Sequence, residues 1–90
     1  MATVITGTFA GTPTSPEISG RKADIVMDFA GTASVDIERR LPGGTWIKIE
    51  TAITADAERQ KSYAAPTALR LNCTAHTNNV VYALITGADG

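Results

Sequence analysis

Hydrophobic and polar residues alternate along most of the chain, which is the pattern of β-strands that bury one face. The clearest example is ADIVMDF at 23–29, where apolar residues at odd positions alternate with a set that includes two aspartates. TASVDIER at 32–39 repeats the pattern. Further strands are expected at 3–9, 45–50, 57–63, 69–75 and 80–86, with turns at LPGG (41–44) and TNN (77–79). The pattern therefore predicts about seven short strands.

Strands of this number and spacing are typical of an antiparallel sandwich or barrel. We predict an all-β protein with one domain, 1–90: a small antiparallel β-sandwich, Ig-like or jelly-roll-like. Residues 1–20 are expected to form a strand and a flexible extended loop or arm, because 11–20 holds two prolines among Ser, Thr and Gly. Residues 21–90 are expected to form the main sandwich. The polar segment 57–63 suits a sheet edge. A helix at 53–65 is the alternative, but Ser62 and Tyr63 weaken it and no apolar stripe is present.

The size of the chain favours self-association. A domain of 90 residues buries only about 60–65% of the surface that its unfolded chain exposes, so its stability alone is marginal. Small domains compensate with disulfides, metals or oligomerisation. A single cysteine, Cys73, excludes an internal disulfide, and a single histidine, His76, argues against a metal site. We therefore expect a homo-oligomer.

The charge balance disfavours two classes of partner. With 8 basic and 9 acidic residues, the formal net charge is −1, which provides no long-range field to attract nucleic acid or an anionic membrane. The start of the sequence lacks the basic and apolar regions of a secretion signal, and no apolar run is long enough to span a bilayer. We therefore expect folding in a reducing cytosol and interpret the NCT motif at Asn72 as a chance match to the glycosylation sequon.

Candidate catalytic and metal-binding groups are sparse. Four acidic residues would share a sheet face if the strands at 23–29 and 32–39 paired, and could then bind calcium or act as acid and base: Asp24, Asp28, Asp36 and Glu38. The preferred interpretation is a solvated charged face. Cys73 and His76 are three positions apart on one strand and point to opposite faces, so they form no nucleophile pair. We predict no enzymatic activity, no cofactor and no metal.

Trp46, the only tryptophan, is the most informative single residue. In TWIKIE, Ile47 and Ile49 share one face, which puts Trp46 on the other face with Lys48. It could pack over the stems of Arg39 or Lys48, anchor a protein contact, or stack on a sugar ring. Tyr82 is a similar case, on a strand that is apolar on both faces and therefore expected to be covered on both sides. The candidate partner interface comprises Arg39, Arg40, Trp46, Lys48 and Tyr82.

Three segments resemble small virion structural proteins of phages. These are GTFAGTPTSPEI at 7–18, LPGGTW at 41–46, and LRLNCTAHT at 69–77 followed by VYAL at 81–84. The similarity spans most of the chain. It departs at Ala68, where a tyrosine is usual, and at Ala83, where an arginine is usual, so we expect a polar contact at the rim to differ.

The resemblance implies a virion structural protein assembled in the host cytoplasm. The first hypothesis is a capsid decoration (cement) protein, with a trimer favoured, that binds the major capsid protein and stabilises the head through many weak contacts. A head–tail adaptor or tail component is the second. A carbohydrate-binding module that uses Trp46 and Tyr82 is the third, from a different class.

Overall fold

The computed structural model describes residues 3–11 and 14–86, and the described residues form six β-strands without a helix. The strands are β1 (Thr3–Phe9), β2 (Ile18–Phe29), β3 (Ala33–Arg40), β4 (Trp46–Ile53), β5 (Ala57–His76) and β6 (Val80–Thr86). All pairings are antiparallel. The all-β antiparallel prediction is therefore confirmed, and the alternative helix at 53–65 is wrong because most of that segment belongs to β5.

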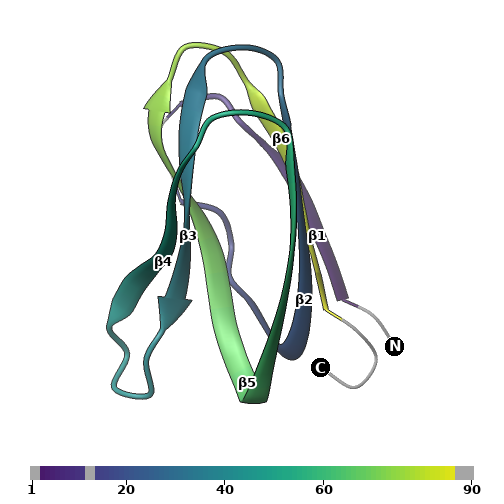
Figure 1. The fold of residues 1–90 in the computed structure, drawn as a ribbon, viewed down its shortest axis with the longest axis vertical. Helices are drawn as coiled ribbons and strands as arrows, with labels where there is room; N and C mark the ends of the chain where they lie inside the picture. Colours follow the sequence, from purple (N-terminus) through teal and green to yellow (C-terminus); the bar gives the residue numbers. More distant parts are fainter. Residues whose placement is uncertain (1–2, 12–13, 87–90) are drawn as a thin grey trace.

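The strands form one hydrogen-bonded sheet in the order β1-β6-β2-β5-β3-β4. β5 joins its two halves, because Ala57–Ser62 and 67–69 pair with β2 whereas 69–76 pair with β3. Figure 1 shows β5 running down one side of the molecule, bending sharply, and returning up the other side. This one strand replaces the two predicted at 57–63 and 69–75, which explains six strands where about seven were expected.

The bend in β5 has a local cause. Thr67 pairs with Gly20 and Ser62 pairs with Lys22. The residues of β5 between Ser62 and Thr67 are therefore unpaired with β2, which has a single residue between Gly20 and Lys22. Pro66, which has no backbone N–H to contribute to a sheet, lies in this unpaired segment. The proline therefore bends the strand without removing a hydrogen bond from the ladder. The polar segment expected at a sheet edge belongs instead to an interior strand of the sheet, although its residues Ala57–Ser62 pair with β2 alone.

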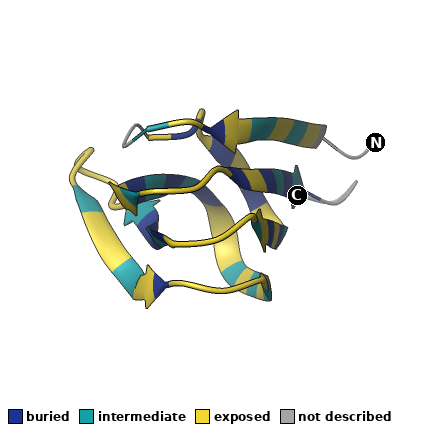
Figure 2. Ribbon diagram, turned by 90° about the horizontal axis from the view of Figure 1, so that it is seen from above, coloured by how far each residue is buried: buried dark blue, intermediate teal, exposed yellow. Residues whose placement is uncertain are grey.

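The bend brings the inner faces of both halves against a single hydrophobic core. Figure 2, which looks along the strands, shows them arranged around this core with the buried residues in dark blue. The largest fully buried side chains come from all strands except β4: Phe9, Ile25, Met27, Val35, Ile37, Leu69, Leu71, Cys73, Val80 and Leu84. They belong to one cluster, so neither half has a core of its own.

The N-terminal segment is anchored to the sheet along most of its described length. β1 pairs with β6 in continuous register from Thr3 opposite Thr86 to Phe9 opposite Val80. Farther along, Ser15 is buried, its backbone N–H donates to the Leu71 carbonyl at 2.8 Å, and its hydroxyl accepts from the Leu71 N–H at 2.8 Å. The expected flexible segment is therefore corrected at these positions, because side-chain and backbone groups of Ser15 complete the edge of β5.

Gly7, which seemed to interrupt the first strand, leaves space for an aromatic ring. It lies opposite Tyr82, and a Cβ at position 7 would come within 2.5 Å of the tyrosine hydroxyl oxygen. The Tyr82 ring packs against Phe9, with ring centroids 4.7 Å apart. A side chain at position 7 would therefore displace a core residue.

Within the described ranges, no helix is long and apolar enough to cross a membrane.

Candidate functional site

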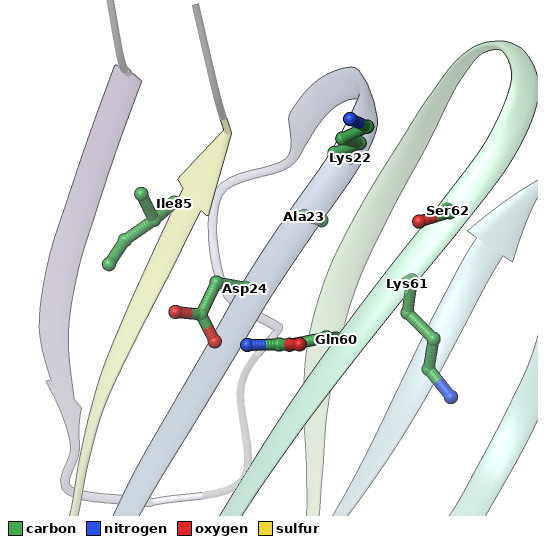
Figure 3. A pocket seen from close by; sticks show the side chains of 7 residues that line it. All are labelled: Lys22, Ala23, Asp24, Gln60, Lys61, Ser62 and Ile85. Carbon is green, nitrogen blue, oxygen red and sulfur yellow. The ribbon is translucent and has the colours of Figure 1, made fainter.

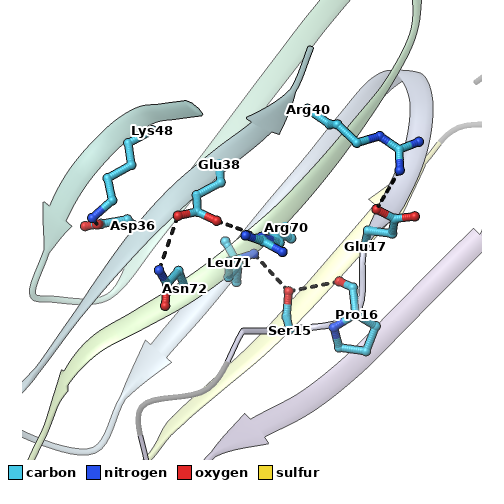
Figure 4. A network of polar contacts seen from close by, with 10 residues as sticks. All are labelled: Ser15, Pro16, Glu17, Asp36, Glu38, Arg40, Lys48, Arg70, Leu71 and Asn72. Carbon is cyan, nitrogen blue, oxygen red and sulfur yellow. Dashed lines mark hydrogen bonds and ion pairs between the residues drawn. The ribbon is translucent and has the colours of Figure 1, made fainter. Parts of the chain in front are cut away.

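The acidic residues of β3 are buried under basic side chains from neighbouring strands. Asp36 and Glu38 are only 4% and 5% exposed. Glu38 accepts a hydrogen bond from Arg70 Nε at 2.6 Å and one from the Asn72 amide at 3.2 Å. Asp36 lies 2.8 Å from Lys48 Nζ and accepts a hydrogen bond from the Ala52 N–H at 2.9 Å. Figure 4 shows Glu38 with Arg70 and Asn72, and Lys48 beside Asp36.

The predicted group of four carboxylates does not assemble. Asp24 and Asp28 are on β2, which pairs with β5 and β6 and not with β3. Among the described residues, no group of three or more His, Cys, Asp or Glu side chains is placed to hold a metal ion. The interpretation of Asp36 and Glu38 as part of a solvated face is corrected too, because β4 and β5 supply the side chains that cover them.

Trp46 packs against arginines, but not against the residues expected. The Arg70 guanidinium carbon lies 4.1 Å from the ring centroid and that of Arg40 lies 5.9 Å away. Arg39 instead stacks over Tyr63 at 4.6 Å, and Lys48 is held by Asp36. Alternation along β3 explains the difference, because it puts Arg39 on the same face as the core and Arg40 opposite Trp46 in the register.

Tyr82 is a core residue. It is 7% exposed and packs against Phe9, so it is not available for a partner at the surface of this chain. Of the five candidate interface residues, the structure therefore brings Arg40 and Trp46 together and places Arg39, Lys48 and Tyr82 elsewhere. Arg70 was missed, because its proximity to Trp46 depends on the pairing of β5 with β3, which no local pattern specifies.

Cys73 and His76 make separate contacts, but the expected alternation between them is interrupted by a register shift, since Cys73 lies opposite Val35 and His76 opposite Ala33. Cys73 is buried, and burial raises the pKa of its thiol, which donates a weak hydrogen bond to the Ala75 carbonyl at 3.5 Å. This keeps the thiol protonated and a poor nucleophile. The His76 ring contacts Asn79 Oδ1 at 3.1 Å, across the turn at 77–79.

Two carboxyl groups should make the stability sensitive to acid. Burial acts to raise the pKa of Asp36, but hydrogen bonds from Lys48 and the Ala52 N–H outweigh it and hold the pKa below its ordinary 3.8. The pKa of Glu50 is likewise lowered from 4.5: burial opposes the shift, and hydrogen bonds from Arg59 and Lys61 prevail. The folded state holds these protons less tightly than the unfolded chain does. The stabilisation from the two carboxylates is therefore fully present above their pKa values in the unfolded chain, and it is lost as the pH falls through their pKa values in the folded state.

We therefore expect Asp36→Asn to destabilise the protein at pH 7 and to lose that effect in acid. The difference in unfolding free energy from the original protein should narrow as the pH falls below about 4, where the carboxylate becomes protonated. Urea denaturation followed by circular dichroism between pH 7 and pH 3 measures this difference. Asp28→Asn, at an exposed position of β2, controls for the loss of one charge. A constant deficit for Asp36→Asn at all pH values would contradict the prediction.

The two edges of the sheet differ in how far they discourage further pairing. At β4, the register with β3 shifts at two places, Ala52 has a φ of 56°, and Lys48 and Glu50 project from the strand. Bulges and charges of this kind blunt an edge. β1 has an uninterrupted register with β6, and its residues 3–9 include no charge and no proline. Among the described strands, β1 is therefore the less protected edge.

The outer side of β1, β6 and β2 carries a group of apolar side chains, bordered by threonines of β1 and aspartates of β2. We call five residues the apolar outer face: Val4, Val26, Val81, Ala83 and Ile85. Val4 and Val81 are 57% and 50% exposed. Across the strands, Val4 lies opposite Ile85, and Ala83 lies opposite Val26, so the side chains are adjacent. This face explains why the last strand is apolar on both sides.

A cavity of about 280 Å³ borders the apolar outer face, between Ile85 and the polar residues of β5. Figure 3 shows the Asp24 carboxylate beside it, whereas Lys61 points away. Lys61 instead contacts Glu50, with the Nζ–Oε1 distance at 3.4 Å. The Oδ1 atom of Asp24 is buried and has no hydrogen-bond partner among the described residues. A contact on the apolar outer face would enclose this carboxylate as well.

Comparisons of the chain with protein-family models, curated proteins and solved structures found no match. The geometry by itself defines a small antiparallel β-sheet domain with two contrasting surfaces. The polar face around Asp36 and Glu38 is satisfied by ion pairs within the chain, whereas β1 and the apolar outer face have no covering element among the described residues.

Proposed function

We propose that the chain is a non-enzymatic virion structural protein, most specifically a capsid decoration protein that stabilises a phage head through oligomeric surface contacts. The observation that carries the proposal is the uncharged edge of β1 together with the apolar outer face. Contiguous apolar surface next to an unprotected strand edge is a typical site of protein association. In fold terms, the bent sheet would act as a β-sandwich of Ig-like or jelly-roll-like type.

The proposed occupant of this surface is a second copy of the chain. β1 carries no charge for a charged partner to complement, whereas an uncharged strand from another copy can add backbone hydrogen bonds without repulsion. Burying the apolar outer face would supply the stabilisation that a domain of this size lacks alone. Pairing of two β1 edges would be isologous and would give a dimer, whereas the trimer favoured by the resemblance requires β1 and the apolar outer face of each copy to contact a different surface of the next copy.

The polar side would then face the major capsid protein. Trp46 is half-buried between Arg40 and Arg70, and the Arg40 side chain is 46% exposed and held only by Glu17 at 3.6 Å. Aromatic and arginine side chains in this arrangement are enriched at the energetic centres of interfaces. A sugar platform made by Trp46 and Tyr82 is not supported, since Tyr82 is buried and Arg70 lies over the Trp46 ring.

Val81→Lys tests the surface directly. A lysine on the apolar outer face should shift the protein to monomers, because an oligomer would have to remove from water both the new charge and Asp28, which lies opposite position 81. Native mass spectrometry and sedimentation velocity report the oligomeric state. Ile47→Lys is the matched control, since Ile47 is similarly apolar and 39% exposed but lies on β4. Oligomers of unchanged size in Val81→Lys would exclude this face as the contact.

The virion assignment is tested by the copy number and radial position of the chain in purified particles. Quantitative mass spectrometry and an electron-microscopic reconstruction should find hundreds of copies on the outside of the head. About a dozen copies at one vertex would indicate a head–tail adaptor instead. Absence of the chain from particles would refute the virion function even if the protein is oligomeric in solution.

A further inference from the structure

Arg39 is half-buried, and one of its N–H groups has no hydrogen-bond acceptor among the described residues. The Nε atom of Arg39 is buried, and it makes no hydrogen bond within the part of the chain that the structure describes. Five other basic residues each contact a carboxylate: Arg40, Lys48, Arg59, Lys61 and Arg70. Arg39 has only the ring of Tyr63 beneath its guanidinium. A buried charged donor without an acceptor is costly, so a group that supplies the acceptor would bind favourably.

Arg39 lines a cavity with the chemistry to receive such a group. The cavity, of about 300 Å³, lies between the turn at 41–44 and the bend of β5. Arg39, Arg40, Ser19 and Thr67 contribute polar groups to its wall, and no acidic residue lines it. Pro66, on the bend, is one of the residues that supply its apolar surface. Arg39 is the basic residue of this lining without a carboxylate partner among the described residues, since Arg40 pairs with Glu17.

We propose that this cavity binds a carboxylate group of a partner protein. A carboxylate presents two oxygens in one plane, which matches the Nε–H and a terminal N–H of an arginine, so Arg39 could donate one hydrogen bond to each oxygen. Ser19 also lines the cavity, and its hydroxyl is a further potential donor to the carboxylate. Tyr63 supports the guanidinium from the opposite side at 4.6 Å.

The surroundings favour a carboxylate on an apolar stem over a highly charged phosphate. The net charge of −1 gives the chain no long-range attraction for polyanions. Leu41, Pro42 and Pro66 would contact the methylene groups of a glutamate, and they offer nothing to solvate a dianion. The same carboxylate chemistry could be supplied by an acidic side chain or by the C-terminus of a chain, and these two sources are separable by experiment.

The test uses nuclear magnetic resonance of the intact chain, in which each arginine Nε–H has its own signal. N-acetyl-glutamate amide is titrated at constant ionic strength, and its neutral isostere N-acetyl-glutamine amide is the matched ligand. We expect the Arg39 signal to shift saturably with the glutamate compound and to remain in place with the glutamine compound. A capped dipeptide with a free carboxyl end, compared with its amide, measures the preference for a chain terminus.

Arg39→Met should weaken binding of the glutamate compound at least tenfold, as followed by the backbone amide signals of Ser19 and Thr67. Arg21→Met, at an exposed arginine outside the cavity, should leave binding unchanged. Core amide signals report whether each variant is folded, and the titration of the original chain does not depend on either variant. An unmoved Arg39 signal, an equal response to the glutamine compound, or tighter binding of inorganic phosphate would overturn the proposal. Because this experiment uses the isolated chain, its result is independent of the virion assignment.

Discussion

Replacing Leu71 by alanine should lower the free energy of unfolding by about 3–4 kcal/mol, the range expected for a large cavity in a small core. Leu71 is fully buried and lies opposite Ile37, in the part of β5 that pairs with β3. Its backbone N–H and carbonyl also bond to Ser15, so the surrounding chain is fixed and cannot collapse easily into the space. In a domain of this size, such a loss is a large fraction of the total stability.

Urea denaturation followed by tryptophan fluorescence and circular dichroism measures this effect. Leu41→Ala is the matched control, because it makes the same chemical change at a residue that is 38% exposed in the turn after β3. We expect the control to cost less than about 1 kcal/mol. Similar costs at the two positions would mean that Leu71 is not in a tightly enclosed core.

Glu38→Gln should lower the free energy of unfolding by about 2 kcal/mol, within the range for hydrogen bonds to buried charges. The substitution keeps the shape of the side chain but leaves Arg70 without its carboxylate at 2.6 Å. Because the Arg70 side chain is 27% exposed, water recovers part of the loss and the effect stays below that of a fully buried pair. The stack of Arg70 on Trp46 should loosen, which a shift in tryptophan fluorescence would report.

A double variant separates the cost of an unpaired charge from the value of the pair. Glu38→Leu with Arg70→Leu removes both charges, and its stability should exceed that of Glu38→Leu alone, since no unpaired charge remains on that face. Glu58→Gln, at an exposed position in β5, controls for loss of a carboxylate. If the double variant is less stable than Glu38→Leu, the Arg70 stem contributes mainly through Trp46.

The strands could be predicted from the sequence because alternation is a local property. The segments at 3–9, 23–29 and 80–86 lie within observed strands, and the segment at 32–39 matches β3 except at its first residue. The continuity of β5 could not be predicted in the same way. Ala64, Ala65 and Pro66 resemble a break between two strands, and only the position of β2 and β3 on either side determines that the chain bends there and continues.

The candidate site shows the same limit. The pattern correctly separated Trp46 from the core and put it close to arginines, but Arg39 alternates into the opposite face and Arg70 comes from a distant strand. Burial of Asp36 and Glu38 was missed for the same reason, because the side chains that cover them belong to β4 and β5. Tyr82 was misplaced because its strand is apolar on both faces, so alternation alone could not decide which face is the core.

The pairing of β1 with β6 has a consequence for synthesis on the ribosome. β1 is made first, yet its only partner among the described strands is β6, made more than seventy residues later. At typical rates of about 5–20 residues per second, β1 waits several seconds or more before it can join the sheet. Its uncharged, β-branched sequence is prone to pair with other chains during that interval. Neighbouring nascent chains on one messenger would therefore be the first copies that β1 encounters.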